Sequence, residues 1–380
     1  MMKSKNIKES VISAAFTIAI ATVLLVMTFD GEITGFFRIG DVLPLSPFVN
    51  KESVRVVQGE IGYDGQYFLT IALDPTLDDN GTINALDNPK YRYKRIGYPL
   101  AGYILGLGNP KIIPYALVGL NLACITGLVL LISLFRDPEM AKDMPLPSAL
   151  WILAFPGVWV CLTLTTAELF GSLLFVAALF LFKDRRYVLS AVVLAGACFT
   201  RETYLATVVV LAGLLLFQCR AKFTSYLLLG AIPPLAWFFF VNSYIQKGTT
   251  GVHENLALPF TGINTKIRSI IGGGFSNIEL FEGLCFAVLL ITAALLAISV
   301  VRSRASLSIA HIVALPIIAI LTVSNMQILE YHAGYLRVFL DIWIILLLVP
   351  GGKWFRYART VLLLLSGIAS FLYVLNYTRL

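Results

Sequence analysis

The sequence predicts an all-α protein that crosses a membrane many times. Of its 380 residues, 58% are hydrophobic and only 13% are charged, whereas soluble domains carry roughly 25% charged residues. The apolar residues form long continuous runs and do not alternate with polar residues, which favours membrane helices over a membrane barrel. A single transmembrane domain over residues 1–380 is therefore expected.

The apolar runs predict about eleven membrane spans, because a helix needs about 20 residues to cross the hydrocarbon core. The runs at 148–163 and 187–200 are the shortest and depart most from that length. The predicted spans are 11–29, 112–135, 148–163, 167–183, 187–200, 204–219, 224–242, 281–301, 307–324, 337–350 and 358–377.

The first run is expected to be an uncleaved helix with its N-terminus in the cytoplasm. It is longer than the apolar part of a signal peptide, and Asp30-Gly31-Glu32 makes a poor cleavage site. Basic residues then gather in the short connections on the inner side. These residues are Lys3, Lys5, Lys8, Arg136, Lys142, Lys183, Arg185, Arg186, Arg220, Lys222, Arg302, Arg304, Lys353, Arg356 and Arg359.

This orientation makes the chain integral to the cytoplasmic membrane and defines two long outer loops, residues 30–111 and 243–280. The net charge of +7 arises largely from the short connections, so no nucleic-acid partner is expected. The five cysteines lie in or beside apolar runs and are expected to be small buried hydrophobic residues, without disulfide or zinc spacing. They are Cys124, Cys161, Cys198, Cys219 and Cys285.

The stretch 62–75 in the first outer loop predicts a short amphipathic helix with Asp64 at its head. Pro75 ends the helix, because the residue before a proline is pushed out of the helical region. Asp64 is either the helix N-cap or a general base at the membrane surface. Asp74 is expected to form a turn ahead of Pro75, and a metal role shared with Asp64 is the weaker alternative. The apolar face comprises Tyr63, Tyr67, Phe68, Ile71 and Ala72.

The next segment, residues 91–100, places basic side chains between tyrosines. It is either an interfacial belt at the lipid headgroups or a phosphate site, in which Arg92 and Arg95 would offer bidentate donors.

Ionisable residues at span ends are the remaining candidates, because such groups are costly at membrane depth and are either paired or functional. Arg201 is expected to pair with Glu168 or Glu202, or to contact substrate. Arg337 and Asp341 are four residues apart and can pair along one helix face, or Arg337 can face a phosphate. His332 is the histidine expected near a site, whereas His311 in an apolar span is expected to be a core residue.

Four motifs in order resemble the GT-C class of membrane glycosyltransferases, which use polyprenyl-phosphate sugars. Residues 63–72, YDGQYFLTIA, resemble the W-D-x-x-Y-F-x-x-I-A stretch of the second mannosyltransferase of GPI-anchor synthesis. Residues 98–100, YPL, resemble its F-P-L element, and residues 166–170, TAELF, its S-E-S-L-F element. Residues 200–202, TRE, resemble a turn found across the class. Uncharacterised bacterial membrane proteins share the Y-D-G-Q form.

This resemblance implies an inverting transferase that moves a sugar, with mannose as the family's example, to a glycan, lipid or protein acceptor on the outer face. Asp64 would be the general base, and basic residues would stabilise the leaving polyprenyl phosphate. No cofactor is required, although some members of the class use a divalent cation. The implied donor-phosphate and substrate-binding residues are Arg92, Arg95, Arg201, Arg337, Gln66, Glu168, Glu202, Tyr67 and His332.

Two other functions fit the same sequence. A transporter or flippase would use Glu168, Arg201 and Glu202 as a substrate or proton path. A catalytically inactive member would bind lipid-linked glycans as an assembly subunit, and substituting Asp64 would then have no effect.

Overall fold

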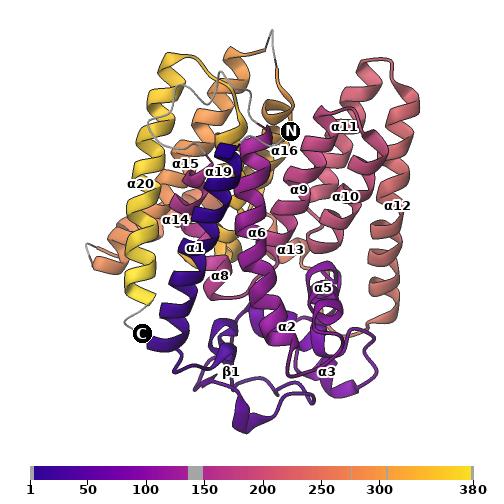
Figure 1. The fold of residues 1–380 in the computed structure, drawn as a ribbon, viewed down its shortest axis with the longest axis vertical. Helices are drawn as coiled ribbons and strands as arrows, with labels where there is room; N and C mark the ends of the chain where they lie inside the picture. The colour runs from indigo at the N-terminus through magenta and orange to yellow at the C-terminus, as the bar shows by residue number, and fades with distance from the viewer. Residues whose placement is uncertain (1–3, 136–148, 275, 305–306, 378–380) are drawn as a thin grey trace.

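A computed structural model describes residues 4–135, 149–274, 276–304 and 307–377. It is a bundle of helices, most of which run along the long axis of the molecule (Figure 1). Within the described residues, five helices are long and apolar enough to cross a membrane. They are α1 (Ser4–Met27), α6 (Ile113–Phe135), α12 (Ala221–Tyr244), α15 (Asn277–Arg302) and α20 (Lys353–Tyr377). The predicted all-α architecture is thus confirmed at this coarser level.

Four further helices occupy predicted spans but are shorter than the roughly 20 residues of a full crossing. α10 packs against α9 and α12, and α11 packs against α12 and α16. The short helices are therefore packed against one another and against the long helix α12. They are α9 (Glu168–Lys183), α10 (Tyr187–Thr200), α11 (Tyr204–Phe217) and α16 (Ile309–Val323).

Two predicted spans are not single helices. Residue 148 lies outside the described residues, and the rest of 148–163 divides into η3 (Leu150–Ala154) and α8 (Pro156–Thr163). The break falls at Phe155, which is extended because Pro156 follows it. The run 337–350 divides at Phe339 between α18 (His332–Val338) and α19 (Leu340–Leu348). Both α8 and α19 are buried along their whole length, so their apolar residues face protein.

The first loop folds at one end of the bundle, beside the C-terminus and opposite the N-terminus (Figure 1). It contains a parallel pair of two-residue strands, in which Ile39 pairs with Val56. Its elements are η1 (Ile33–Phe37), β1 (Ile39–Gly40), η2 (Lys51–Ser53), β2 (Val56–Val57), α2 (Asp64–Leu73), α3 (Asn80–Asn84), α4 (Pro89–Tyr93) and α5 (Gly97–Leu105). The later connecting helices are α13 (Val252–Asn255), α14 (Thr261–Gly272) and α17 (Met326–Leu329).

The predicted helix at 62–75 exists, but it is not amphipathic. All ten residues of α2 are buried, because the rest of the first loop covers the side that faces away from the bundle. Tyr63 is the N-cap and Asp64 is the first helical residue, so the N-cap prediction for Asp64 is wrong. Gly62 precedes them with a φ of +84°, in the left-handed region that glycine adopts without a steric penalty.

Asp74 forms the predicted turn at the end of α2. Its carboxylate accepts hydrogen bonds from the backbone N–H groups of Asp78 (3.0 Å) and Asp79 (3.2 Å) and from the Thr82 hydroxyl (2.6 Å). These bonds occupy both carboxylate oxygens, which makes Asp74 a structural residue of the first loop.

Gly65 sets how closely α2 approaches the bundle. A Cβ atom at this position would lie 2.3 Å from the carbonyl oxygen of Leu164, well inside the contact distance. Because both sides of this contact are backbone, a side chain here can be accommodated only if α2 moves.

We expect Gly65→Ala to lower the melting temperature in detergent, through an overpacking cost of about 1–3 kcal/mol. Gly119→Ala in α6 is the matched control, because a Cβ there meets nothing within 4 Å. Thermal unfolding followed by fluorescence checks the prediction. Equal stability of the two variants would contradict the close approach of α2 to Leu164.

Candidate functional site

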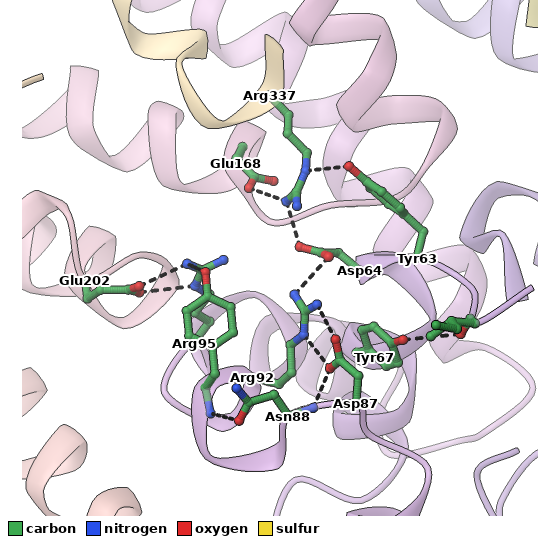
Figure 2. Close-up of polar contacts among 12 residues, drawn as sticks. Tyr63, Asp64, Tyr67, Asp87, Asn88, Arg92, Arg95, Glu168, Glu202 and Arg337 are labelled. Atoms are coloured by element: carbon green, nitrogen blue, oxygen red, sulfur yellow. Dashed lines mark hydrogen bonds and ion pairs between the residues drawn. The ribbon is translucent and has the colours of Figure 1, made fainter. Parts of the chain in front are cut away.

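Five charged side chains of alternating sign form a row, which we call the charged row (Figure 2). Four of them are buried, and Asp87 at one end is exposed. The row combines residues that are far apart in the sequence, contributed by α2, α4, the loop before α4, α9 and α18. In order along the row, its members are Asp87, Arg92, Asp64, Arg337 and Glu168.

Asp64 lies at the centre of the row between two arginines. Its Oδ1 is 2.8 Å from Nη1 of Arg92, and its Oδ2 is 2.7 Å from Nη1 of Arg337. The Asp64 side chain is only 6% exposed, and each arginine side chain is 11% exposed. Burying these charges is tolerable only because each carries an opposite charge at contact distance.

Each arginine is also held from its other side. Nη1 of Arg337 is 2.7 Å from Oε1 of Glu168, and its Nε donates to the Tyr63 hydroxyl at 2.9 Å. Nε and Nη2 of Arg92 donate to the two oxygens of Asp87, both at 2.8 Å. These contacts fix both guanidinium planes before any ligand binds.

The charge of Asp64 follows from this setting. Burial alone raises the pKa of its carboxyl group, but the positive charges of Arg337 and Arg92 outweigh burial and leave the pKa below its ordinary value. Asp64 is therefore a carboxylate at neutral pH. It is a weak base while both arginines contact it, because base strength falls with pKa.

A second arginine–carboxylate pair lies beside the row. Arg95 donates from Nε and Nη2 to the two oxygens of Glu202, at 3.1 and 3.0 Å, and its guanidinium also contacts Tyr91. Burial raises the pKa of Glu202, whereas Arg95 lowers it more strongly, to about 2. Glu202 is the more open member of the pair, with 33% of its side chain exposed.

The predicted partners of Arg201 are wrong. Glu168 pairs with Arg337 and Glu202 pairs with Arg95, while Arg201 donates from Nη1 to the carbonyl oxygen of Val338 at 2.9 Å. Arg201 is 4% exposed, and its Nε has no hydrogen-bond partner among the described residues. A buried donor without an acceptor is costly, so a ligand oxygen there would be stabilising.

The predicted pair of Arg337 and Asp341 is also absent. Asp341 accepts hydrogen bonds from Ser172 at 2.6 Å and Tyr204 at 2.8 Å. The helix break at Phe339 removes the continuous helical spacing that the pairing requires.

Gln66 and Tyr67, the residues of α2 that follow Gly65, position the site through contacts to β1 and to Arg92. Gln66 Oε1 accepts the backbone N–H of Gly40 at 2.8 Å and so ties α2 to β1. The Tyr67 ring lies under the Arg92 guanidinium, 4.7 Å away, and its hydroxyl donates to the carbonyl oxygen of Ile61.

His332 lies in a separate polar cluster. Oε1 of Glu282 is 2.7 Å from both the backbone N and Nδ1 of His332, and Oε2 is 2.9 Å from Nζ of Lys266. His311, by contrast, is fully buried in α16 and bonds Ser299, as expected of a core histidine.

Two hollows of different chemistry are lined by chain neighbours of these charged residues: Tyr63 precedes Asp64, and Ile96 follows Arg95. The aromatic cleft has a volume of about 800 Å³ and the apolar groove about 670 Å³. The aromatic cleft is lined by Arg38, Glu60, Gly62, Tyr63, Leu164, Asn277, Ile278, Phe281, Tyr331, His332, Ala333, Tyr373, Asn376 and Tyr377. The apolar groove is lined by Pro75, Thr76, Ile96, Gly97, Leu100, Tyr103, Phe170, Leu174, Val192, Val193, Gly196, Phe199 and Trp237.

Sequence reasoning missed three charged partners: Asp87, Lys266 and Glu282. Asp87 sits among several polar residues in a long loop, where nothing in the sequence distinguishes it. Glu282 had a usable signal, because it is an acid near the start of an otherwise apolar helix, and such residues are paired or functional by default.

No protein-family model matches this chain, and neither does any curated protein or solved structure. In the described parts of the chain, no group of three or more His, Cys, Asp and Glu side chains is placed to hold a metal ion. Because no comparison gives a match, the resemblance to GT-C enzymes remains a prediction from the motifs.

Asp64→Asn is expected to lower the melting temperature at neutral pH, because Arg92 and Arg337 each lose one buried counter-charge. Complete loss of a buried partner costs about 3–5 kcal/mol, and the remaining contacts to Asp87 and Glu168 offset part of this. Thermal unfolding in detergent measures the effect, with Asp78→Asn as the control because Asp78 is exposed.

The pH dependence gives a second readout. The pKa of Asp64 is lower in the folded than in the unfolded chain, so its stabilisation is full above the unfolded value of about 4 and is lost as the pH falls further. The difference between the wild-type protein and Asp64→Asn should therefore be constant from about pH 5 to pH 8 and narrow below about pH 4. No difference at neutral pH would contradict the ion pairs.

Proposed function

We propose that this chain is an integral membrane glycosyltransferase of the GT-C type. It transfers a sugar from a polyprenyl-phosphate donor to an acceptor hydroxyl on the outer face of the cytoplasmic membrane. One observation carries the proposal: Asp64, the acid of the motif that resembles these enzymes, is held between two buried arginines, and its chain neighbour Tyr63 lines the aromatic cleft.

The apolar groove suits the isoprenoid tail of the donor. Its lining is almost wholly apolar and comes from α5, α9, α10 and α12. Leu100, Tyr103 and Val192 are 39%, 36% and 63% exposed, so the groove lies on the outside of the bundle, where a lipid can enter from the side. Burying each methylene there stabilises the complex by about 0.8 kcal/mol.

The donor phosphate would meet the arginines next to this groove. Arg95 immediately precedes Ile96, whose side chain lines the groove, and its partner Glu202 is partly exposed and so can be displaced. Arg201 offers a buried Nε without an acceptor in the described structure. Bidentate arginine–phosphate contacts are strong enough to compete with arginine–carboxylate pairs.

Donor binding would also change Asp64. A donor phosphate that also contacted Arg92 or Arg337 would compete with Asp64 for that arginine. The pKa of the Asp64 carboxyl group would then rise toward its ordinary value, and Asp64 would become a stronger base. The acceptor hydroxyl oxygen then attacks the anomeric carbon and its proton passes to Asp64. The bond between the anomeric carbon and the phosphate oxygen breaks, polyprenyl phosphate leaves with the electron pair, and the configuration inverts.

The test is transfer of label from polyprenyl-phosphate mannose, and then from other polyprenyl-phosphate sugars, by purified protein in liposomes. Asp64→Asn should reduce transfer by at least about 100-fold, the usual contribution of a general base. Asp78→Asn, an exposed carboxylate in the same loop, should leave transfer unchanged.

Two results would reject parts of this proposal. Undiminished transfer by folded Asp64→Asn would remove the base role. Substrate-dependent flux into proteoliposomes without any covalent product would instead identify a transporter or flippase.

The exposed cysteine Cys219 can report the orientation of the chain in the membrane. Four of the five cysteines are buried as expected, but Cys219 is exposed, because it lies in the turn between α11 and α12. That turn carries Arg220 and Lys222 and lies at the opposite end of the bundle from the first loop (Figure 1), which favours a cytoplasmic position.

A membrane-impermeant maleimide should therefore label Cys219 in inside-out vesicles but not in intact spheroplasts. Glu52→Cys in a Cys219→Ser background is the matched control, because Glu52 is exposed in the first loop, and it should show the reverse pattern. Labelling of Cys219 from outside would invert the proposed topology and place Asp64 in the cytoplasm.

A further inference from the structure

The aromatic cleft has a wall of linked rings. The ring centroids of Tyr63 and Tyr331 are 6.2 Å apart, those of His332 and Tyr373 are 5.9 Å apart, and those of Tyr373 and Tyr377 are 5.7 Å apart. Tyr331 and His332 join these pairs at 6.0 Å. The contacts are mostly edge to face, so rings of several orientations are presented to the cleft.

Planar polar groups face the same cleft. Arg38 and Glu60 form a bidentate pair at 2.8 and 2.9 Å, with 39% and 35% of their side chains exposed. Asn277 and Asn376 are exposed on the first turn of α15 and near the end of α20. Amide, carboxylate and guanidinium groups offer adjacent donors and acceptors, which match the neighbouring hydroxyl groups of a sugar ring.

His332 supplies a fixed acceptor in this cleft. Glu282 lies 2.7 Å from its Nδ1 and is itself held by Lys266 and by the Tyr335 hydroxyl. In the neutral ring this contact places the proton on Nδ1 and leaves Nε2 as an acceptor. The His332 side chain is 26% exposed, so an incoming hydroxyl group can reach it.

The chemistry of the lining identifies the ligand class. Ring faces bind the C–H faces of a pyranose, and the planar polar groups bind its hydroxyls. A lipid tail is better matched by the apolar groove. A phosphorylated ligand is less well matched, because Arg38 is the one arginine or lysine among the lining residues named above and the Glu60 carboxylate lines the cleft beside it.

We propose that the aromatic cleft is a carbohydrate-binding site, with Tyr331 as a stacking platform and His332 as the acceptor of a sugar hydroxyl. Its role as the acceptor site rests on the proposed transferase function. The cleft meets the charged row at Tyr63, whose hydroxyl is bonded to Arg337 and whose chain neighbour is Asp64. A sugar in the cleft could therefore present a hydroxyl toward Asp64.

The experiment measures sugar binding without requiring transfer. The purified full chain in detergent is titrated calorimetrically with a panel of mannose, glucose, galactose and N-acetylglucosamine disaccharides. At least one should bind, and Tyr331→Ala and His332→Leu should each weaken that binding by about tenfold or more. Tyr331 is 40% exposed, so its replacement is not expected to unfold the chain.

Tyr115→Ala is the matched control, because Tyr115 is an exposed tyrosine of α6 that lines neither hollow. It should leave sugar binding unchanged. Sugar binding that depends on the cleft residues supports the proposal even if no transfer is ever detected.

Three results would overturn the proposal: no binding across the panel, binding unaffected by both cleft substitutions, or binding that Tyr115→Ala weakens equally. If transfer is detected but neither cleft substitution raises the KM for the acceptor, the transferase function stands and the cleft is not its acceptor site.

Discussion

The two ion pairs of Asp64 join α2 to two other helices of the chain. Arg92 comes from α4 and Arg337 from α18, and through Glu168 the same row reaches α9. Buried ion pairs add little net stability, because desolvation offsets most of the attraction, but removing one partner is costly. We infer that they instead favour this docking position of the first loop, because a shifted position would leave buried charges unpaired. The close backbone approach at Gly65 serves the same end, since it brings Asp64 within reach of both arginines.

The fold could be predicted from the sequence where a run of apolar residues is long enough to cross the membrane as one helix. The long runs of α1, α6, α12, α15 and α20 are apolar over a full crossing length, and length alone identified them. The helix before Pro75 and the turn at Asp74 followed from local backbone rules. The prediction of one helix each at 148–163 and 337–350 was wrong for a physical reason. A segment buried in protein and one buried in lipid have the same composition, so only Pro156 in the first run indicated a break, and nothing indicated one at Phe339.

The site could be predicted as a set of residues but not as a set of pairs. Asp64, Arg92, Glu168 and Arg337 were all candidates, and the structure brings them into one row. Their partners were wrong or missing, because pairing depends on which helix ends meet, and sequence spacing describes only one helix at a time. Arg201 shows the consequence. It was expected to pair with Glu168 or Glu202, whereas Arg337 and Arg95 pair with those carboxylates. Asp87 was missed because a loop acid that pairs with a buried arginine and one that faces only solvent look alike in sequence.

The electrostatics of Asp64 bear on how the proposed reaction would avoid wasting its donor. A base that is always active beside a reactive sugar phosphate would activate water as readily as an acceptor hydroxyl. Here the two arginines lower the pKa of Asp64, so in the ligand-free chain it is a poor base. A donor phosphate that contacted one of these arginines would raise the pKa of Asp64 again, so Asp64 would become a stronger base only while the donor is bound. Water would still compete at that moment unless another group occupied the space beside the anomeric carbon. The aromatic cleft opens at Tyr63, directly beside Asp64, and a sugar bound there would fill that space and displace the water. Selectivity for transfer over hydrolysis would then require that the aromatic cleft and the donor's apolar groove be filled at the same time.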